Sequence, residues 1–90
     1  MRLSSKHLKT LHSIFDNPVR ADVEWKKIEA LFFALGAEIR EGRGSRLRVA
    51  LKDVRAVFHR PHSEKETDKG ALKSVRKFLI NAEVTPSKFQ

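Results

Sequence analysis

The spacing of the apolar residues changes in the middle of this chain. Up to Leu35 they recur at intervals of three and four residues, which is the spacing of one helical face, whereas from Ala37 to His62 they alternate with charged residues. A period of two is that of a strand with one buried face. Gly36 stands at the change, and glycine is favoured in the left-handed conformation that follows many helices. The pattern predicts that helices and an antiparallel sheet share one small domain.

Three helices are predicted around the alternating region. The first begins at a cap provided by Ser4 or Ser5, and the second begins after Asp22, which is a favourable cap. The third follows the alternating region and has Thr67 or Asp68 as its cap. Each helix has one side that must pack against another element. These sides consist of Leu8, Leu11, Ile14 and Phe15 in the first helix, Trp25, Ile28, Leu31, Phe32 and Leu35 in the second, and Leu72, Val75, Phe78, Leu79 and Ala82 in the third.

Three strands are predicted between the second and third helices, over residues 37–41, 45–51 and 54–60. Their connections are short: Gly42-Arg43-Gly44 is the first, and Lys52-Asp53 is a candidate for a two-residue hairpin turn. A three-stranded meander of this size is not stable alone, so helices must cover one of its faces. The predicted fold is therefore α+β, with the order α-α-β-β-β-α.

Arginines gather on one face of this predicted sheet. In the middle strand Arg46, Arg48 and Lys52 point away from the apolar residues, and Arg55 and His59 share their side in the third strand, with no acidic residue interrupting the row. The chain has 19 Lys and Arg against 11 Asp and Glu, a net charge of +8, which favours a polyanionic partner. Arginine, whose planar fork fits phosphate, dominates this stretch. The alternative is a solvated face that discourages edge pairing.

The nucleic-acid interpretation assigns a set of binding residues. Ser45 belongs to a turn whose backbone could hold phosphate, and the lysines lie at the positive end of the last helix. The expected binding residues are Arg40, Arg43, Ser45, Arg46, Arg48, Lys52, Arg55, Arg60, Lys69 and Lys73.

Several chemistries are excluded or disfavoured. The absence of cysteine rules out disulfides, thiolate zinc sites and a cysteine nucleophile. A metal site at His59 and His62 with Glu64 or Glu66 is disfavoured, because the two histidines are separated by Pro61 rather than placed on one helical face. We expect no metal and no cofactor. The N-terminus lacks the apolar core of a signal peptide, and no run has membrane length, so we expect a soluble cytoplasmic protein.

Two histidines stand at the end of the third strand. His59 and His62 lie at the edge of the basic face, and histidine is the side chain best suited to proton transfer near neutral pH. The alternative is that His59 is a half-buried strand residue and His62 a turn residue. The sequence leaves both interpretations open.

Four stretches occur in an order typical of one known family. They are the helix ending "LG", the run "AEIREGRGSR", the strand ending "FHRPH" and the helical segment "ETDKGALKSVRKFLINAEV". Because these four stretches occur in this order, residues 25–84 resemble the HicA family of bacterial toxins. The resemblance implies a fold like that of a double-stranded-RNA-binding domain and an mRNA interferase, a metal-independent endoribonuclease that forms an oligomeric complex with a HicB-like antitoxin. It also divides the chain into an N-terminal helical extension (1–21), a HicA-like RNA-binding domain (22–86) and a tail (87–90).

The resemblance places the family's catalytic histidine at Arg46 of Gly44-Ser45-Arg46. Arginine stays protonated and cannot act as a general base, so Arg46 can only stabilise the charge that develops on phosphorus oxygens. Proton transfer would then fall to His59 or His62, and these three residues are the expected catalytic set. A non-catalytic RNA-binding module and a purely protein-interacting subunit remain the alternatives.

Overall fold

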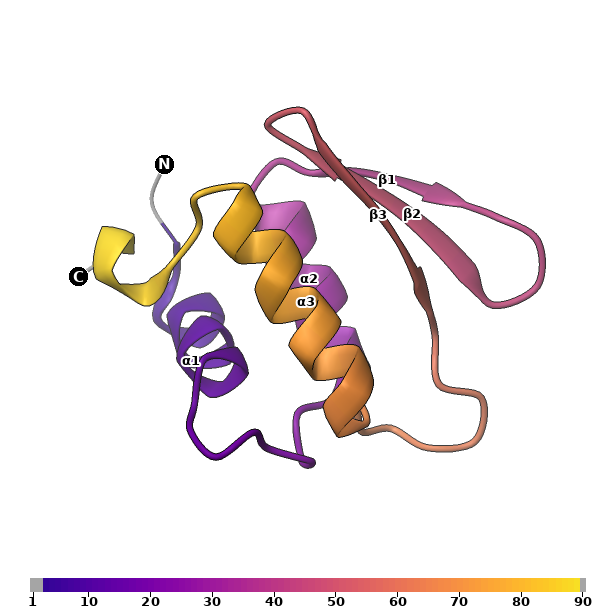
Figure 1. Cartoon of the computed structure of the whole chain (residues 1–90), viewed down its shortest axis with the longest axis horizontal. Coiled ribbons are helices and arrows are strands. Elements are labelled where there is room, and N and C mark those ends of the chain that lie inside the picture. Colours follow the sequence, from indigo (N-terminus) through magenta and orange to yellow (C-terminus); the bar gives the residue numbers. More distant parts are fainter. Residues whose placement is uncertain (1–2, 90) are drawn as a thin grey trace.

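A computed structural model describes residues 3–89 of the chain. It has the predicted order α-α-β-β-β-α (Figure 1). Of the predicted extension and tail, residues 1, 2 and 90 lie outside the described part. No helix within residues 3–89 is long and apolar enough to cross a membrane. The elements are α1 (Ser5–Ile14), α2 (Trp25–Ala34), β1 (Glu38–Glu41), β2 (Arg46–Leu51), β3 (Val54–His59), α3 (Lys69–Asn81) and the short 3-10 helix η1 (Pro86–Phe89).

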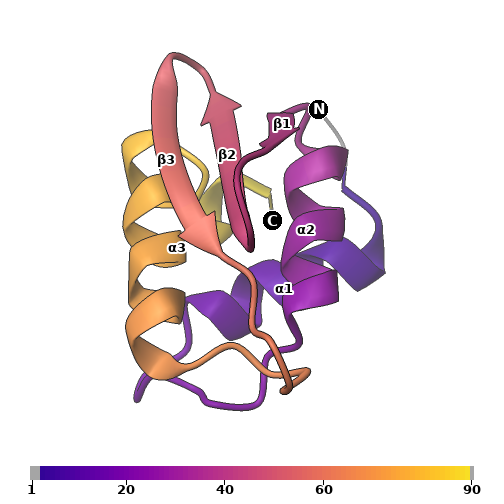
Figure 2. The same cartoon turned by 90° about the vertical axis from the view of Figure 1, so that its right-hand side faces the viewer.

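The elements form three layers. The strands make one antiparallel sheet in the order β1-β2-β3. Helices α2 and α3 lie side by side against one face of this sheet, and α1 packs on their other side (Figures 1 and 2). The second face of the sheet is covered by none of the described elements, as Figure 2 shows from that side. The fold thus presents one open β surface.

The core lies between the sheet and the paired helices. Leu47, Val49 and Leu51 of β2 are buried, as their alternation predicts. Phe58 of β3 contacts Phe32 of α2 and Phe78 of α3, with ring centroids 5.6 and 5.7 Å away. Such aromatic pairs add to the free energy gained by burying apolar area. They fix both helices against the third strand.

Helix α1, the predicted N-terminal extension, packs into the same core. Leu11 and Ile14 have 0% of their surface exposed. Arg76 of α3 donates hydrogen bonds to the carbonyls of Ile14 at 2.9 Å and Asp16 at 2.7 Å, and its guanidinium lies 5.8 Å from the centre of the Phe15 ring. These bonds satisfy the Ile14 carbonyl, at the last residue of α1, and the Asp16 carbonyl, in the turn that follows the helix.

Most predicted caps and turns are confirmed. The Ser4 side chain accepts a hydrogen bond from the His7 N–H, and the Asp68 side chain accepts one from Ala71 at 2.7 Å. The two-residue turn between β2 and β3 has positive φ at both positions, 49° and 67°, as a type I′ turn requires. Gly36 has the expected positive φ of 82°.

The predicted start of α2 after Asp22 is wrong. The Asp22 carboxylate accepts two hydrogen bonds from Arg20, and the chain stays extended as far as Glu24. There it pairs with the segment that precedes α3: Thr67 donates to the Val23 carbonyl at 2.8 Å, and Trp25 donates to the Lys65 carbonyl at 2.9 Å. Because this segment pairs with residues about forty positions further along the chain, α2 begins at Trp25 and not directly after Asp22.

Candidate nucleic-acid interface

The open face of the sheet carries a group of the cations predicted to bind nucleic acid. Directly opposed residues of an antiparallel pair point to the same side. Arg40 opposes Arg48 across β1 and β2, and Arg46 opposes His59 across β2 and β3. The arginine face, as we call this surface, consists of exposed side chains on all three strands: Arg40, Arg46, Arg48, Arg55 and His59.

Arg46 and His59 are a closely opposed pair at one end of this face. The Arg60 N–H donates to the Ser45 carbonyl at 3.0 Å, and from there hydrogen-bonded and non-hydrogen-bonded pairs alternate along the two strands. Arg46 and His59 form the first non-hydrogen-bonded pair, in which the Cβ atoms lie about 4.5 to 5.5 Å apart. A guanidinium and an imidazole can therefore reach the same phosphate group.

The expectation that no acidic residue interrupts the basic row is wrong at one edge. Glu38 shares the parity of Arg40 in β1 and therefore its side of the sheet. It accepts a hydrogen bond from Arg40 Nε at 2.7 Å. Both side chains are well exposed, so the pair adds little stability. Within residues 3–89, no carboxylate pairs with Arg46, Arg48 or Arg55.

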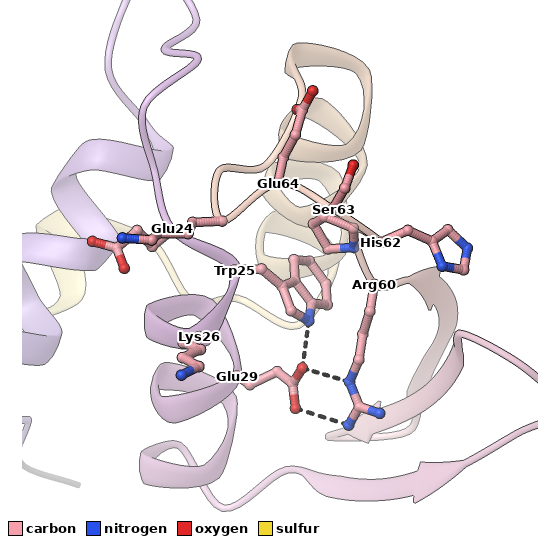
Figure 3. A pocket seen from close by; sticks show the side chains of 10 residues that line it. Glu24, Trp25, Lys26, Glu29, Arg60, His62, Ser63 and Glu64 are labelled. Carbon is pink, nitrogen blue, oxygen red and sulfur yellow. Dashed lines mark hydrogen bonds and ion pairs between the residues drawn. The ribbon is translucent and has the colours of Figure 1, made fainter.

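Arg60, expected among the binding residues, points away from the arginine face and is held by two carboxylates. It donates to both oxygens of Glu29, at 2.8 and 3.0 Å, and to both oxygens of Glu41, at 2.7 and 3.0 Å. The Trp25 indole N–H donates to the same Glu29 carboxylate (Figure 3). These four residues are named the Arg60 cluster. Its bonds use most of the five N–H groups of the guanidinium, which leaves little capacity for phosphate.

The hydrogen bonds of the Arg60 cluster shift the pKa values of two of its members in the direction that favours their charged forms. Hydrogen bonds from Arg60, together with its positive charge, lower the pKa of Glu41 below its ordinary value. The hydrogen bonds to Glu29 and Glu41 raise the pKa of Arg60 further above a value that is already high. Glu41 and Arg60 therefore stay ionised in the physiological range, and the hydrogen bonds of Arg60 tie α2 to the ends of β1 and β3.

The remaining predicted binding residues lie around the arginine face rather than on it. Arg43 and Ser45 are in the hairpin between β1 and β2, next to Arg46, and Lys52 is in the turn at the opposite end of β2. Lys69 and Lys73 are exposed on α3, which covers the other face of the sheet. The structure thus brings Arg43 and Ser45 near Arg46 but separates the two lysines from the arginine face.

His59 and His62 line one cavity, between the end of β3 and the start of α3. Its volume is about 280 Å³, and its wall includes Glu64, Glu66 and Asp68. Arg46 is not part of the wall. The described residues contain no group of three histidine or acidic side chains placed to hold a metal ion. His59 and His62 therefore contribute to the wall of the same cavity, and Arg46 opposes His59 on the arginine face.

Sequence reasoning placed Trp25 correctly in the core but missed Glu29 and its hydrogen bonds with Trp25 and Arg60. Trp25 and Glu29 both lie on α2, one turn apart, and Arg60 is 31 residues further along the chain than Glu29. A charged residue beside an apolar helical stripe is ordinarily a solvent-facing residue, so periodicity alone gives no signal of this contact. The one available signal in the sequence is that Glu29 lies at the border of the apolar side of the second helix, where a carboxylate can reach a partner on another element.

One family is similar to this chain. The family model described as the HicA toxin of bacterial toxin-antitoxin systems matches residues 25–82. The match begins at the first residue of α2 and includes the sheet, the arginine face and α3, but not α1. No curated protein and no solved structure matches the chain. Since the family match covers more than half of the chain and the fold agrees with the order of elements predicted, the chain belongs to the HicA toxin family of bacterial toxin–antitoxin systems.

Proposed function

We propose that this toxin binds mRNA on the arginine face and cleaves it in the cytoplasm, which arrests translation until a HicB-like antitoxin binds the toxin. The observation that supports this best is the pairing of Arg46 with His59 on an exposed cationic sheet face. It combines a permanent positive charge with a group able to transfer a proton, as phosphodiester cleavage requires.

Binding would rest on the arginines. Arg46, Arg48 and Arg55 are exposed and lack carboxylate partners among the described residues, so their charge is available to phosphates. Each phosphate contact releases condensed cations from RNA, and binding should weaken steeply as salt rises. The net charge of +8 adds a long-range attraction to RNA and equally to an acidic antitoxin.

Cleavage would proceed without a metal. One histidine takes the proton of a ribose 2′-hydroxyl, whose oxygen attacks the adjacent phosphorus and forms a cyclic phosphate. The bond to the 5′-oxygen breaks, and the second histidine gives that oxygen a proton. His59 and His62, which line one cavity, are assigned these two roles, and Arg46 stabilises the negative charge on the phosphorus oxygens.

Replacing His59 by Ala tests the proposal. The variant should lose RNA cleavage and toxicity while its RNA affinity stays within about twofold, because the arginines remain. His12, an exposed histidine on α1, provides the matched control, and His12→Ala should behave as the wild type. A His59→Ala protein that still cuts RNA at the normal rate would remove His59 from the mechanism.

A second function is favoured by Arg46 itself. Arginine stands where the family resemblance places a catalytic histidine, so the protein could hold RNA and block translation without cutting it. In that case purified protein leaves RNA intact at every pH, yet Arg46→Ala and Arg48→Ala weaken binding. A protein that shifts no RNA at low salt would instead indicate that the arginine face serves only an acidic protein partner.

A further inference from the structure

One large apolar side chain lies within the cationic surface. Val57 of β3 is 54% exposed, and within the described sheet it is the one large apolar side chain that is exposed. Arg48 opposes it directly on β2, and Arg55 and His59 are two residues away on the same strand. Val57 is thus an apolar spot with two arginines and a histidine around it.

The surface around Val57 is hollowed. A groove of about 650 Å³ crosses the three strands, with Val57 and Ala50 among the residues that line it and Arg40, Arg48, Arg55 and Glu38 also in its wall. The groove combines apolar side chains, which can contact a flat group, with charged side chains, which can orient that group, and ligand sites use both kinds of contact.

We infer that Val57 and Ala50 form the floor for one unpaired nucleobase of a bound RNA, and that the guanidinium groups of Arg48 and Arg55 hold the phosphates beside it. This inference rests on the proposed function, since it assumes that RNA occupies the arginine face. It adds a specificity residue, Val57, and a substrate class, unpaired rather than duplex RNA.

The inferred preference for unpaired RNA follows from the accessibility of the base faces, which differs between duplex and single-stranded RNA. In an A-form duplex the faces of the bases are stacked and covered, so a protein surface meets phosphates, ribose hydroxyls and base edges but no base face. An unpaired nucleotide can turn its base toward Val57 while its phosphates stay near the arginines. Sheet surfaces that bind single-stranded RNA stack bases on aromatic side chains, whereas here the apolar contact is a valine on the edge strand β3.

Val57 lies close to the residues that are proposed to cleave RNA. His59 is the next residue on the same side of β3, about 7 Å further along the strand. The nucleotide that rests on Val57 therefore adjoins the Arg46–His59 pair. Its base would determine which phosphodiester bond lies beside that pair.

Fluorescence anisotropy with three labelled probes tests the inference. The probes are a short 2′-O-methylated RNA strand, which cannot be cut because it lacks the attacking hydroxyl, the same strand annealed to its complement, and the same strand with abasic sites. The proteins are the wild type, Val57→Thr, Val57→Tyr and Ile80→Thr. The last is the control, because Ile80 is a 49% exposed branched residue on α3.

The wild type should bind the unpaired strand more tightly than the duplex or the abasic strand. Val57→Thr keeps the shape of the side chain but replaces a methyl by a hydroxyl, and should weaken binding to the unpaired strand about fourfold. Val57→Tyr should strengthen it, because an aromatic ring stacks on a base. Ile80→Thr should match the wild type with all three probes.

Two results would overturn the inference. If all three probes bind equally and the Val57 variants equal the wild type, RNA binding stands and the role of Val57 is wrong. If no probe binds even at low salt, the proposed function fails and the inference fails with it.

Discussion

Arg60 and Glu29 form a two-point contact, with Nε–Oε2 at 2.8 Å and Nη2–Oε1 at 3.0 Å, that joins the end of β3 to helix α2. Their side chains are 31% and 26% exposed, so solvent screens the pair only in part. Two parallel hydrogen bonds between a planar guanidinium and a carboxylate fix the orientation of both groups, in addition to the attraction between their charges. The contact fixes the residue that directly follows His59.

Glu29→Gln should lower the free energy of unfolding by about 2 kcal/mol. The change keeps the size of the side chain but leaves a half-buried guanidinium with a weaker partner, and hydrogen bonds to charged groups contribute about this much. Urea denaturation measures the loss. Glu38→Gln is the control, because the exposed pair of Glu38 with Arg40 should contribute less than about 0.5 kcal/mol. Equal losses in the two variants would contradict the structural role of Glu29.

The contact of Glu41 with Arg60 should make stability depend on pH in the acidic range. Its pKa is lower in the folded protein than the ordinary 4.5, so the unfolded chain takes up a proton first as the pH falls. The stabilisation is therefore present above about pH 4.5 and is lost as the pH falls through the folded value. Urea midpoints of the wild type and Glu41→Gln should differ near neutral pH and converge in acid. A difference that grows in acid would have the wrong sign.

The arginine face should determine the salt dependence of RNA binding. Arg48→Ala should reduce the slope of log affinity against log salt by about 1, since it removes about one phosphate contact. The double change with Arg46→Ala should reduce it by about 2. Titrations at several salt concentrations provide the slopes. Lys9→Ala removes an exposed cation of α1, on the far side of the molecule, and should leave the slope unchanged.

Arg46→His should increase RNA cleavage. The new imidazole would oppose His59 across the strands, at the position where the family resemblance places a catalytic histidine, and we expect a general base there to outweigh the loss of the charge that Arg46 supplies. We expect the rate to rise at least about tenfold, since a positioned general base contributes at least that much. Rates measured on a labelled RNA across pH provide the comparison. Arg48→His, which places the imidazole opposite Val57 instead, is the control and should give no increase.

Ile14→Ala should cost about 3 kcal/mol of stability, because Ile14 is fully buried and a truncated core residue leaves a cavity. Ile80→Ala, at an exposed position, should cost less than about 1 kcal/mol. Thermal or urea denaturation distinguishes the two. A small loss at Ile14 would mean that α1 is dispensable to the core of the HicA-family domain.

Local patterns predicted the fold well where they depend on neighbouring residues. The alternation of residues in β2 predicted which side chains are buried and which are exposed, and Lys52-Asp53 predicted the hairpin turn. Both predictions succeed because side-chain parity and turn conformation are local properties. The cap at Asp68 was found for the same reason. The fold class therefore required no knowledge of distant contacts.

Contacts between distant segments could not be predicted in this way. The sequence placed Arg60 with the binding residues because it follows a basic strand, whereas Glu29 and Glu41 bind it from two other elements. It placed the cap of α2 at Asp22, because the pairing of Val23 with Thr67, which keeps the chain extended there, depends on the folded position of another loop. Which arginines have carboxylate partners and which do not is likewise decided by tertiary contacts.

The two-residue turn at Lys52-Asp53 has a consequence for changes in chain length. It sets the register in which Leu51 opposes Val54, and from there the parity of every residue in β2 and β3. One inserted residue would have to be absorbed as a bulge or would exchange the two faces of a strand, turning arginines inward and leucines outward. Insertions of two residues at this tip, which lengthen both strands together, should therefore be tolerated better than insertions of one.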